Sequence, residues 1–189
     1  MPDLLFIQMS GAPGAGKTTL AHAIAPQIGA VIIDHDVTKS ALLEANVPAS
    51  IAGAASYSLL NALARDLLLQ GLSVIFDSPC FYVELLEHGQ RLAQEIGATY
   101  CYVECRVVDL DELDRRLQNR PRLPSQLAGV RLQPTDGSGK AHVDDEVFRD
   151  WITNMKRPID GYLVVDTTRP LEECLDAALA YIRSSSKVV

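Results

Sequence analysis

The sequence predicts a single α/β domain whose mostly parallel β-sheet is covered by helices on both faces. Short, strongly apolar runs alternate with amphipathic stretches along the 189 residues, as strands alternate with crossover helices. A glycine-rich loop joins the first apolar run to the first amphipathic stretch. Gly29, Gly71 and Gly97 follow three of the expected helices, where glycine favours a left-handed C-terminal cap.

The expected elements follow in chain order. The strands are the short apolar runs Leu4–Met9, Ala30–Ile33, Ser73–Phe76, Thr99–Glu104 and Tyr162–Val165. The helices are the amphipathic stretches Thr18–Gln27, Lys39–Ala45, Ile51–Gln70, Val83–Ile96, Leu110–Asn119 and Leu171–Ile182. A chain of this length suffices for one well-cored domain and is too short for two typical ones. We therefore expect residues 1–189 to form one domain.

Composition narrows the class of protein. No apolar run approaches the roughly 20 residues of a membrane span, and the N-terminus lacks a basic segment leading into an apolar one. We therefore expect a cytoplasmic protein without a membrane partner. The four cysteines form no C-x-x-C pair, which argues against a zinc site. A net charge of −7 argues mildly against a large nucleic-acid footprint.

The glycine-rich loop fits G-x-x-x-x-G-K-[ST] at every fixed position. The motif and the residue that follows it comprise Gly11, Ala12, Pro13, Gly14, Ala15, Gly16, Lys17, Thr18 and Thr19. Between a strand and a helix, such a loop wraps its backbone N–H groups around an anion, and the helix N-terminus adds to the attraction. We expect Lys17 to reach the β- and γ-phosphates and the Thr18 hydroxyl to hold Mg²⁺. The loop therefore predicts a nucleoside triphosphate ligand.

Acidic residues follow the second expected strand, at the sheet edge where the glycine-rich loop lies. Asp36 is a candidate general base that would accept the proton of a substrate hydroxyl. Alternatively, Asp34 or Asp36 caps the next helix. Asp34 could also hold a magnesium-bound water, and the two acids could exchange roles. With Lys39, they form the expected substrate-binding group.

Asp77 ends the third expected strand. An acid at this place beside a phosphate-binding loop contacts Mg²⁺, directly or through water, so we expect Asp77 to join Thr18 there and to border the substrate. The segment Ser78–Tyr82 could line an acceptor pocket, or its aromatic pair could serve ordinary packing.

Basic residues gather further along the chain. They are Arg115, Arg116, Arg120, Arg122, Arg131 and Lys140, in a stretch that becomes rich in proline and glycine. A long irregular insertion of this kind indicates a lid, here about residues 115–142, whose arginines would neutralise charge on the transferred group. The alternative is a solvated basic helix face followed by a loop. The sequence does not fix a role for Arg157.

Taken together, these motifs resemble the small P-loop kinases of the zeta-toxin-like, or AAA_33-like, group, which includes polynucleotide kinase, gluconate kinase and chloramphenicol phosphotransferase. The resemblance spans nearly the whole chain and implies a three-layer sandwich around a five-stranded parallel sheet of order 2-3-1-4-5. It implies ATP as donor, Asp36 as general base, and Arg116 or Arg120 as catalytic lid residue beside Lys17. The segment Val164–Pro170, with Thr168, resembles the one that cradles adenine in this group.

The sequence thus favours an ATP- and Mg²⁺-dependent kinase acting on an alcohol group. A GTPase would need N-K-x-D after a late strand, and the chain has no such tetrapeptide. Overall acidity favours a small hydroxylated acceptor over nucleic acid. A polynucleotide 5′-hydroxyl kinase and a non-kinase ATPase or nucleotide sensor remain as alternatives.

Overall fold

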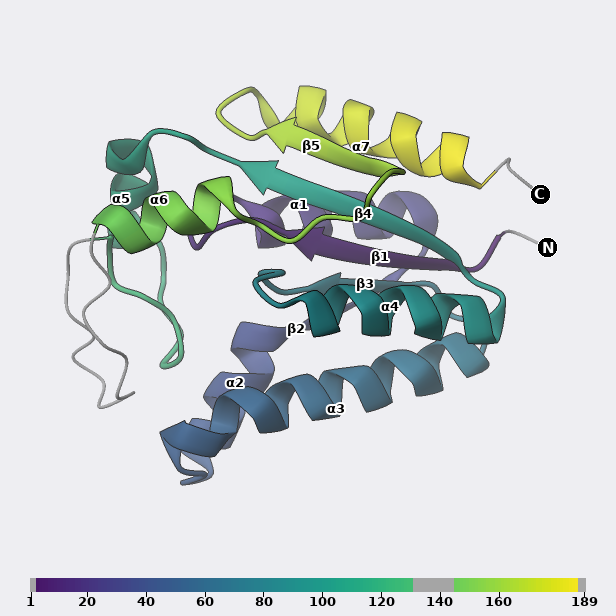
Figure 1. Ribbon diagram of the computed structural model, residues 1–189, viewed down its shortest axis with the longest axis horizontal. Helices are drawn as coiled ribbons and strands as arrows, with labels where there is room; N and C mark the ends of the chain where they lie inside the picture. Colours follow the sequence, from purple (N-terminus) through teal and green to yellow (C-terminus); the bar gives the residue numbers. More distant parts are fainter. Residues whose placement is uncertain (1–2, 131–144, 187–189) are drawn as a thin grey trace.

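The computed structural model describes residues 3–130 and 145–186, which form a parallel five-stranded sheet between two helical layers (Figure 1). The strands are Leu5–Ser10 (β1), Val31–Asp34 (β2), Val74–Asp77 (β3), Thr99–Arg106 (β4) and Tyr162–Asp166 (β5). Their order is β2-β3-β1-β4-β5, and every neighbouring pair is parallel. The predicted fold class and strand order are confirmed.

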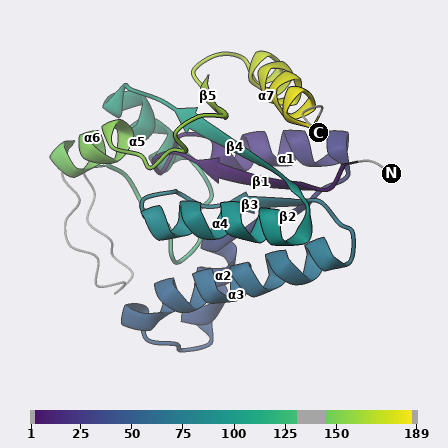
Figure 2. The same cartoon turned by 45° about the vertical axis from the view of Figure 1, so that its right-hand side comes forward.

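Helices cover both faces of the sheet (Figures 1 and 2). They are Lys17–Ile28 (α1), His35–Glu44 (α2), Ala49–Leu69 (α3), Val83–Ile96 (α4), Leu110–Asn119 (α5), Asp145–Thr153 (α6) and Leu171–Ser185 (α7). One face packs against α1 and α7, and the other against α3 and α4. Helices α5 and α6 lie beyond the carboxyl ends of β1 and β4, where ligands bind in parallel sheets.

The central strand β1 supplies core residues to both layers because successive side chains point to opposite faces. Ile7 and Met9 are fully buried on the α1 and α7 side, while Phe6 packs on the α3 and α4 side. The strand is therefore apolar except for Gln8 and the terminal Ser10, and Gln8 accepts a 2.7 Å hydrogen bond from the Tyr100 hydroxyl. Because β1 is buried on both faces, its end is held firmly in the sheet, and the glycine-rich loop that follows starts from a defined position.

Two helices differ from the sequence prediction. Helix α2 begins at His35 rather than Lys39, because the Asp34 carboxylate caps its first turn. Helix α6 was not predicted, since it follows the irregular stretch directly; it buries Phe148 and Ile152. All four cysteines are free and buried. Among the helices in the described part of the chain, none has the length and apolarity needed to cross a bilayer.

Candidate functional site

The loop between β1 and α1 requires glycine for steric reasons. Gly11, Gly14 and Gly16 have φ angles of 132°, 84° and 85°, which other residues rarely adopt. At Gly11 a Cβ would lie 2.2 Å from the carbonyl oxygen of Cys105 on the neighbouring strand β4. The loop therefore fits closely against the end of β4, and its path is determined by the sheet.

Lys17, the first residue of α1, bends back over this loop. Its Nζ donates hydrogen bonds to the carbonyl oxygens of Gly11 at 2.9 Å and Ala12 at 3.2 Å. The ammonium thus lies over the loop, beside the N-terminus of α1, where backbone N–H groups and the helix dipole attract anions. An ammonium beside a helix N-terminus is compatible with a bound phosphate group, and the contact between Lys17 and the β- and γ-phosphates stays a prediction.

Asp77 and Asp34 lie side by side where β3 and β2 end, since the two residues are register partners. Asp77 is buried, and its Oδ2 has no hydrogen-bond partner within the described residues. Burial, together with the neighbouring Asp34 and Asp36, raises the pKa of Asp77 to about 6, despite the opposing effects of Lys17 and Thr18. A buried carboxylate with one unpartnered oxygen, beside the Thr18 side chain, is a suitable partial ligand set for Mg²⁺.

The residues present fit a magnesium ion that is bound mainly through phosphate oxygens and water. Across the described residues, no group of three or more His, Cys, Asp or Glu could hold a metal ion. A nucleotide-borne Mg²⁺ needs only one or two protein ligands, and Thr18 and Asp77 provide that number.

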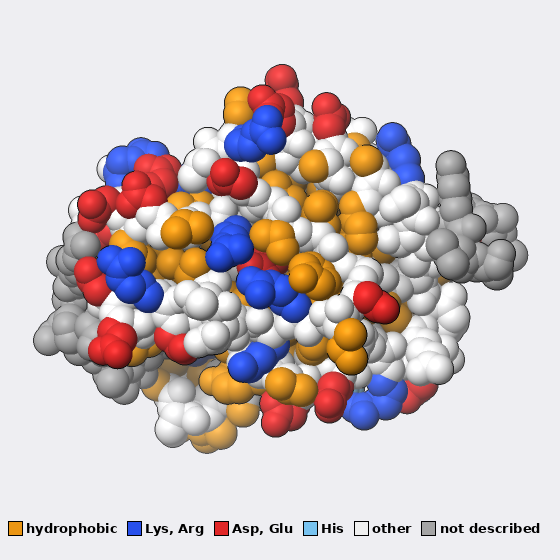
Figure 3. Space-filling model, turned by 45° about the horizontal axis from the view of Figure 1, so that its top comes forward, with side chains coloured by type: hydrophobic (Ala, Val, Ile, Leu, Met, Phe, Trp, Pro, Cys, Tyr) orange, Lys and Arg blue, Asp and Glu red, His pale blue; other side chains and the backbone are white. Residues whose placement is uncertain are grey.

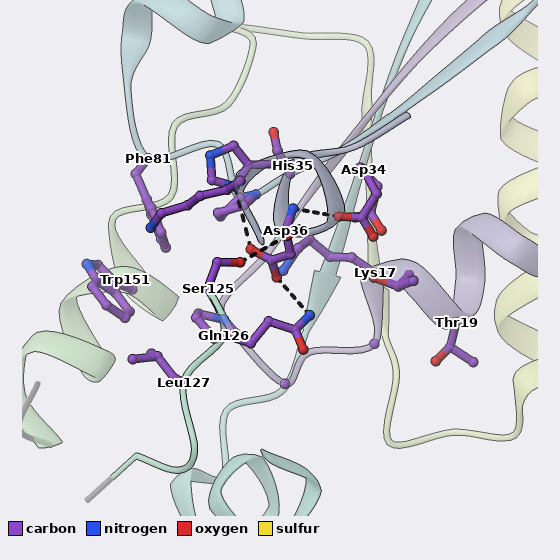
Figure 4. A pocket seen from close by; sticks show the side chains of 18 of the residues that line it. Lys17, Thr19, Asp34, His35, Asp36, Phe81, Ser125, Gln126, Leu127 and Trp151 are labelled. Atoms are coloured by element: carbon purple, nitrogen blue, oxygen red, sulfur yellow. Dashed lines mark hydrogen bonds and ion pairs between the residues drawn. The ribbon is translucent and has the colours of Figure 1, made fainter. Parts of the chain in front are cut away.

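Asp34 and Asp36 differ in the hydrogen bonds that their carboxylates accept (Figure 4). The Asp34 carboxylate accepts hydrogen bonds from the backbone N–H groups of Asp36 at 2.6 Å and Val37 at 3.2 Å. It therefore caps α2, the alternative that the sequence had left open for either acid. Burial and the Asp36 charge raise the pKa of Asp34. Asp36, in the first turn of α2, keeps its carboxylate directed into the space beside Lys17.

Two side chains orient the Asp36 carboxylate, one from a distant segment and one from the adjacent position. Gln126 donates a hydrogen bond from Nε2 to Asp36 Oδ2 at 3.0 Å, and His35 Nδ1 lies 3.5 Å from Oδ1. Burial raises the pKa of Asp36, but His35, Gln126 and Lys17 outweigh it and lower the pKa to about 2. Asp36 is thus ionised at neutral pH, and its carboxylate can accept a hydrogen bond from a hydroxyl group.

Residues around α2 complete this side of the site. His35 stacks on Tyr57 of α3 with ring centroids 4.1 Å apart, which fixes the start of α2. Lys39, one turn after His35, is buried and borders the same cavity. Ser125 donates a hydrogen bond to the carbonyl oxygen of Asp36 at 3.0 Å and accepts one from the Ser40 hydroxyl at 2.9 Å. These contacts hold the segment after α5 against α2.

The arginines of the basic stretch occupy different places. Arg116 donates from Nε to Glu112 at 2.6 Å and from NH2 to the carbonyl oxygen of Thr167 at 2.9 Å, so its guanidinium lies beside Gly16. Arg120 lies on the side of Asp36, and burial lowers its pKa. Arg115 is exposed and pairs with Glu112. The lid residues Arg131 to Lys140 lie outside the described residues.

One cavity of about 1190 Å³ connects these groups. Its lining includes Lys17, Thr18, Asp34, Asp36, Lys39, Asp77, Arg116 and Arg120. A pocket for a single ligand measures roughly 300–1,000 Å³, so this cavity has room for a donor and an acceptor. The glycine-rich loop is at one end, and Asp36 lies between that loop and an apolar end (Figure 4).

Two residues named in the sequence analysis, Thr168 and Arg157, do not line the cavity. The Thr168 side chain is exposed and donates a 2.7 Å hydrogen bond to Asp166, whereas Thr167 borders the cavity and donates one to the carbonyl oxygen of Ala15 at 2.7 Å. Arg157 forms a two-pronged ion pair with the buried Glu104, at 2.6 and 2.8 Å, away from the cavity.

Sequence reasoning missed Ser125, Gln126 and Trp151 as lining residues, and within the segment Val164–Pro170 it singled out Thr168 where Thr167 lines the cavity. For Thr167, the signal was its place one residue after the end of a strand. Ser125 and Gln126 carried no signal, because only the folded chain brings them to Asp36. The amphipathic pattern of α6 could have placed Trp151 at the rim.

Comparisons with known proteins identify the family and the fold. Residues 6–158 match the model of the family AAA_33, described as an AAA domain. No curated protein matches the chain in sequence. Among solved structures, a Chloroflexus aurantiacus protein with a provisional kinase assignment is 24% identical, with a TM-score of 0.72 and coverage of 97% of this chain and 98% of that chain.

Two further structures are named kinases. The APS kinase of Mycobacterium tuberculosis, in complex with AMPPNP and APS, is 18% identical with a TM-score of 0.66, and the match covers 97% of this chain and 99% of the other. A gluconokinase of Sinorhizobium meliloti is also 18% identical, with a TM-score of 0.62 and coverage of 98% and 94%. The chain therefore has the fold of small P-loop kinases, as its motifs predicted.

Proposed function

The chain belongs to the AAA_33 family, and on that premise we propose that it is an ATP-dependent kinase that phosphorylates a hydroxyl of a small molecule. The observation that carries the proposal is the placement of Asp36. An ionised, oriented carboxylate lies in the same cavity as the phosphate-binding loop and is directed into the space beside Lys17. A protein that only held or hydrolysed ATP would not need a second space of this kind.

The residues have distinct roles in this reaction. Asp36 accepts the proton of the acceptor hydroxyl while the hydroxyl oxygen forms a bond to the γ-phosphorus. The bond between that phosphorus and the bridging oxygen breaks, and ADP leaves with this oxygen. Lys17 and the loop N–H groups hold the β- and γ-phosphates. Arg116, beside Gly16, neutralises charge that develops on the transferred group.

Thr18 and Asp77 would hold the Mg²⁺ that accompanies ATP. When bound, the ion would neutralise charge on the β- and γ-phosphates. The Asp77 carboxylate has to be deprotonated to serve as a ligand, and its raised pKa of about 6 makes that condition depend on pH near neutrality.

A small acceptor fits better than a polynucleotide. On the face drawn in Figure 3, acidic and basic side chains of the described residues are interspersed, and the basic ones form no continuous stripe. Net charge is −7, and binding to a phosphodiester backbone rests on clustered positive charge. The kinases of known structure named above act on gluconate and on APS, which are both small. A 5′-hydroxyl oligonucleotide remains the alternative acceptor.

The test is ADP release with Mg²⁺ and ATP, measured against sugars, aminoglycosides, chloramphenicol, nucleosides and 5′-hydroxyl oligonucleotides. We expect release to rise with one class of small acceptor. The variant Asp36→Asn should lower kcat for that acceptor by about 10²–10⁴-fold, with the KM for ATP nearly unchanged. If Asp36→Asn raised only the KM for ATP, Asp36 would be a nucleotide or metal ligand. Equal, slow release with every acceptor would instead identify an ATPase or nucleotide sensor.

A further inference from the structure

The cavity continues past Asp36 into an apolar end that the nucleotide does not require. Phe81, Leu127 and Trp151 line it, and they come from three different parts of the chain: the segment after β3, the segment after α5, and α6. In Figure 4 they lie together on the far side of Asp36 from Lys17 and Thr19. Whatever occupies this end therefore lies on the acceptor side of the base.

The two aromatic rings form a prepared surface. Phe81 and Trp151 have ring centroids 4.9 Å apart at an interplanar angle of 31°, and Trp151 also packs on Phe148 at 5.0 Å. Phe148 is fully buried, so it anchors Trp151 from behind. Phe81 and Trp151 themselves are only half-buried and border the cavity. Large aromatic side chains left partly open in a cavity wall offer flat apolar area to a ligand.

Polar groups of the acceptor side are concentrated elsewhere in the cavity. Asp36, Lys39 and Gln126 gather around the start of α2, whereas the side chains of Phe81, Leu127 and Trp151 offer a single polar group, the indole N–H of Trp151. A polyol occupying the apolar end would find one donor there, the Trp151 indole N–H, and would leave its other hydroxyls without partners from these three side chains, at a cost in binding. A planar apolar body would lose no hydrogen bonds and could pack on both rings.

We propose that this apolar end is a binding subsite for an aromatic body of the acceptor, and that the phosphorylated hydroxyl is carried on a short arm that reaches Asp36. The proposal rests on the proposed kinase function and specifies its acceptor as an aryl alcohol, in contrast to a bare sugar or polyol. Lys39 and Arg120, which border the same space, would contact polar groups of the arm.

Binding can be tested separately from catalysis, because Trp151 is the only tryptophan in the chain. Tryptophan fluorescence is recorded with Mg²⁺ and AMPPNP while 2-phenylpropane-1,3-diol or propane-1,3-diol is added. The two diols carry the same hydroxyls and differ in the ring. We expect a saturable fluorescence change with the phenyl diol and none with the plain diol. Phe81→Leu, which keeps the tryptophan, should weaken the phenyl diol by about tenfold or more.

Turnover gives the second readout. With a set of aryl-substituted diols and their ring-free counterparts as acceptors, the aryl compounds should stimulate ADP release with the lower KM. Phe81→Leu and Trp151→Leu should raise that KM by about tenfold or more and leave the KM for ATP unchanged. Tyr162→Leu is the matched control, because Tyr162 is an exposed aromatic on β5 outside the cavity lining.

The outcomes separate the two proposals. Stimulation by sugars or plain diols, with no fluorescence change on adding aryl diols, would overturn the aromatic subsite and keep the kinase. Saturable binding of aryl diols that weakens in Phe81→Leu, with no acceptor-dependent ADP release, would support the subsite and overturn the kinase. Equal KM values for the aryl and ring-free acceptors in the wild-type protein would also overturn the subsite.

Discussion

The two halves of the cavity are built in different ways. The nucleotide half comes from one continuous segment, Gly11–Thr19, supported by the sheet and by Arg116 and Thr167. The acceptor half is assembled from α2, α3, the segment after α5, and α6, joined by side-chain contacts such as the hydrogen bond from Gln126 to Asp36 across 90 positions of sequence. One half is a local motif, and the other exists only in the folded chain.

This difference bears on how each half can change. The loop is constrained by backbone dihedral angles and by the close approach of Gly11 to β4, so few sequences can form it. The acceptor half depends on side chains presented by separate helices and loops, which can be exchanged one at a time without altering the sheet. The donor is thereby fixed, while the acceptor is free to vary within the same fold.

The largest effect is expected from removing the charge of the nucleotide half. Lys17→Ala should lower kcat/KM by about 10³-fold or more, because in the proposed reaction the ammonium holds the β- and γ-phosphates. The variant also loses the hydrogen bonds to the carbonyl oxygens of Gly11 and Ala12, so thermal unfolding without nucleotide should shift to a modestly lower temperature. Steady-state ADP release and a melting curve measure both quantities. Activity within tenfold of the wild type would contradict the assignment of the loop.

Asp77→Asn should affect stability and activity in opposite directions. The folded pKa of Asp77, about 6, lies above the unfolded value of 3.8, so the ionised carboxylate destabilises the fold increasingly as pH rises through this window. Without Mg²⁺ and with EDTA, the variant should be more stable than the wild type at pH 8, by up to about 3 kcal/mol. The difference should be small near pH 3.5 and vanish at lower pH, well below 3.8, where the carboxyl group is protonated in both states.

Denaturant unfolding at the two pH values tests this expectation. ADP release with Mg²⁺ and ATP should fall in the same variant, because a metal ligand is lost. A variant that is less stable than the wild type at pH 8 would show that a neighbouring group already compensates the Asp77 charge.

The same contrast explains how much the sequence could predict. All five strands and the phosphate loop were identified, because apolar runs, glycine positions and the lysine lie within short windows. The start of α2 was placed four residues late, because a capping role for Asp34 competes with a catalytic one and the sequence does not separate them. The structure separates them through two backbone hydrogen bonds to Asp34.

Other features of the site depend on tertiary contacts. Arg115 and Arg116 are adjacent and chemically alike, yet one is exposed and the other lies beside Gly16, according to which side of α5 each occupies. Gln126 and Trp151 have no local pattern that would mark them as neighbours of Asp36 or of Phe81. Such proximity arises from the packing of separate segments, which one sequence alone does not encode in readable form.

The adjacent arginines provide a matched pair of variants within one helix. Arg116→Ala should raise the KM for ATP and lower kcat, with a combined loss of about 10²-fold, because its guanidinium lies beside Gly16 and bonds Thr167. Arg115→Ala should leave both parameters unchanged, since that side chain is exposed and does not border the cavity. Steady-state kinetics at several ATP concentrations measure the difference. Equal losses in the two variants would assign the effect to α5 as a whole.

The smallest effect is expected at Gln126, which orients the base without contacting the phosphates. Gln126→Leu removes the hydrogen bond to Asp36, so kcat should fall by about tenfold while the KM for ATP is unchanged, as expected for one hydrogen bond to a charged group. Gln126→Glu places a second carboxylate beside Asp36 and should raise the pKa of Asp36 by like-charge repulsion. Its activity should therefore fall more steeply than that of the wild type as pH is lowered.

Pre-steady-state measurements can localise this effect to the acceptor half. A slower phosphoryl-transfer step in Gln126→Leu, with AMPPNP bound as tightly as in the wild type, would mean that a residue 90 positions away in sequence governs only the base. If AMPPNP affinity fell by the same factor as the phosphoryl-transfer rate, the two halves would be coupled through the Ser40 and Ser125 contacts. In that case the acceptor half could not change independently of the donor half.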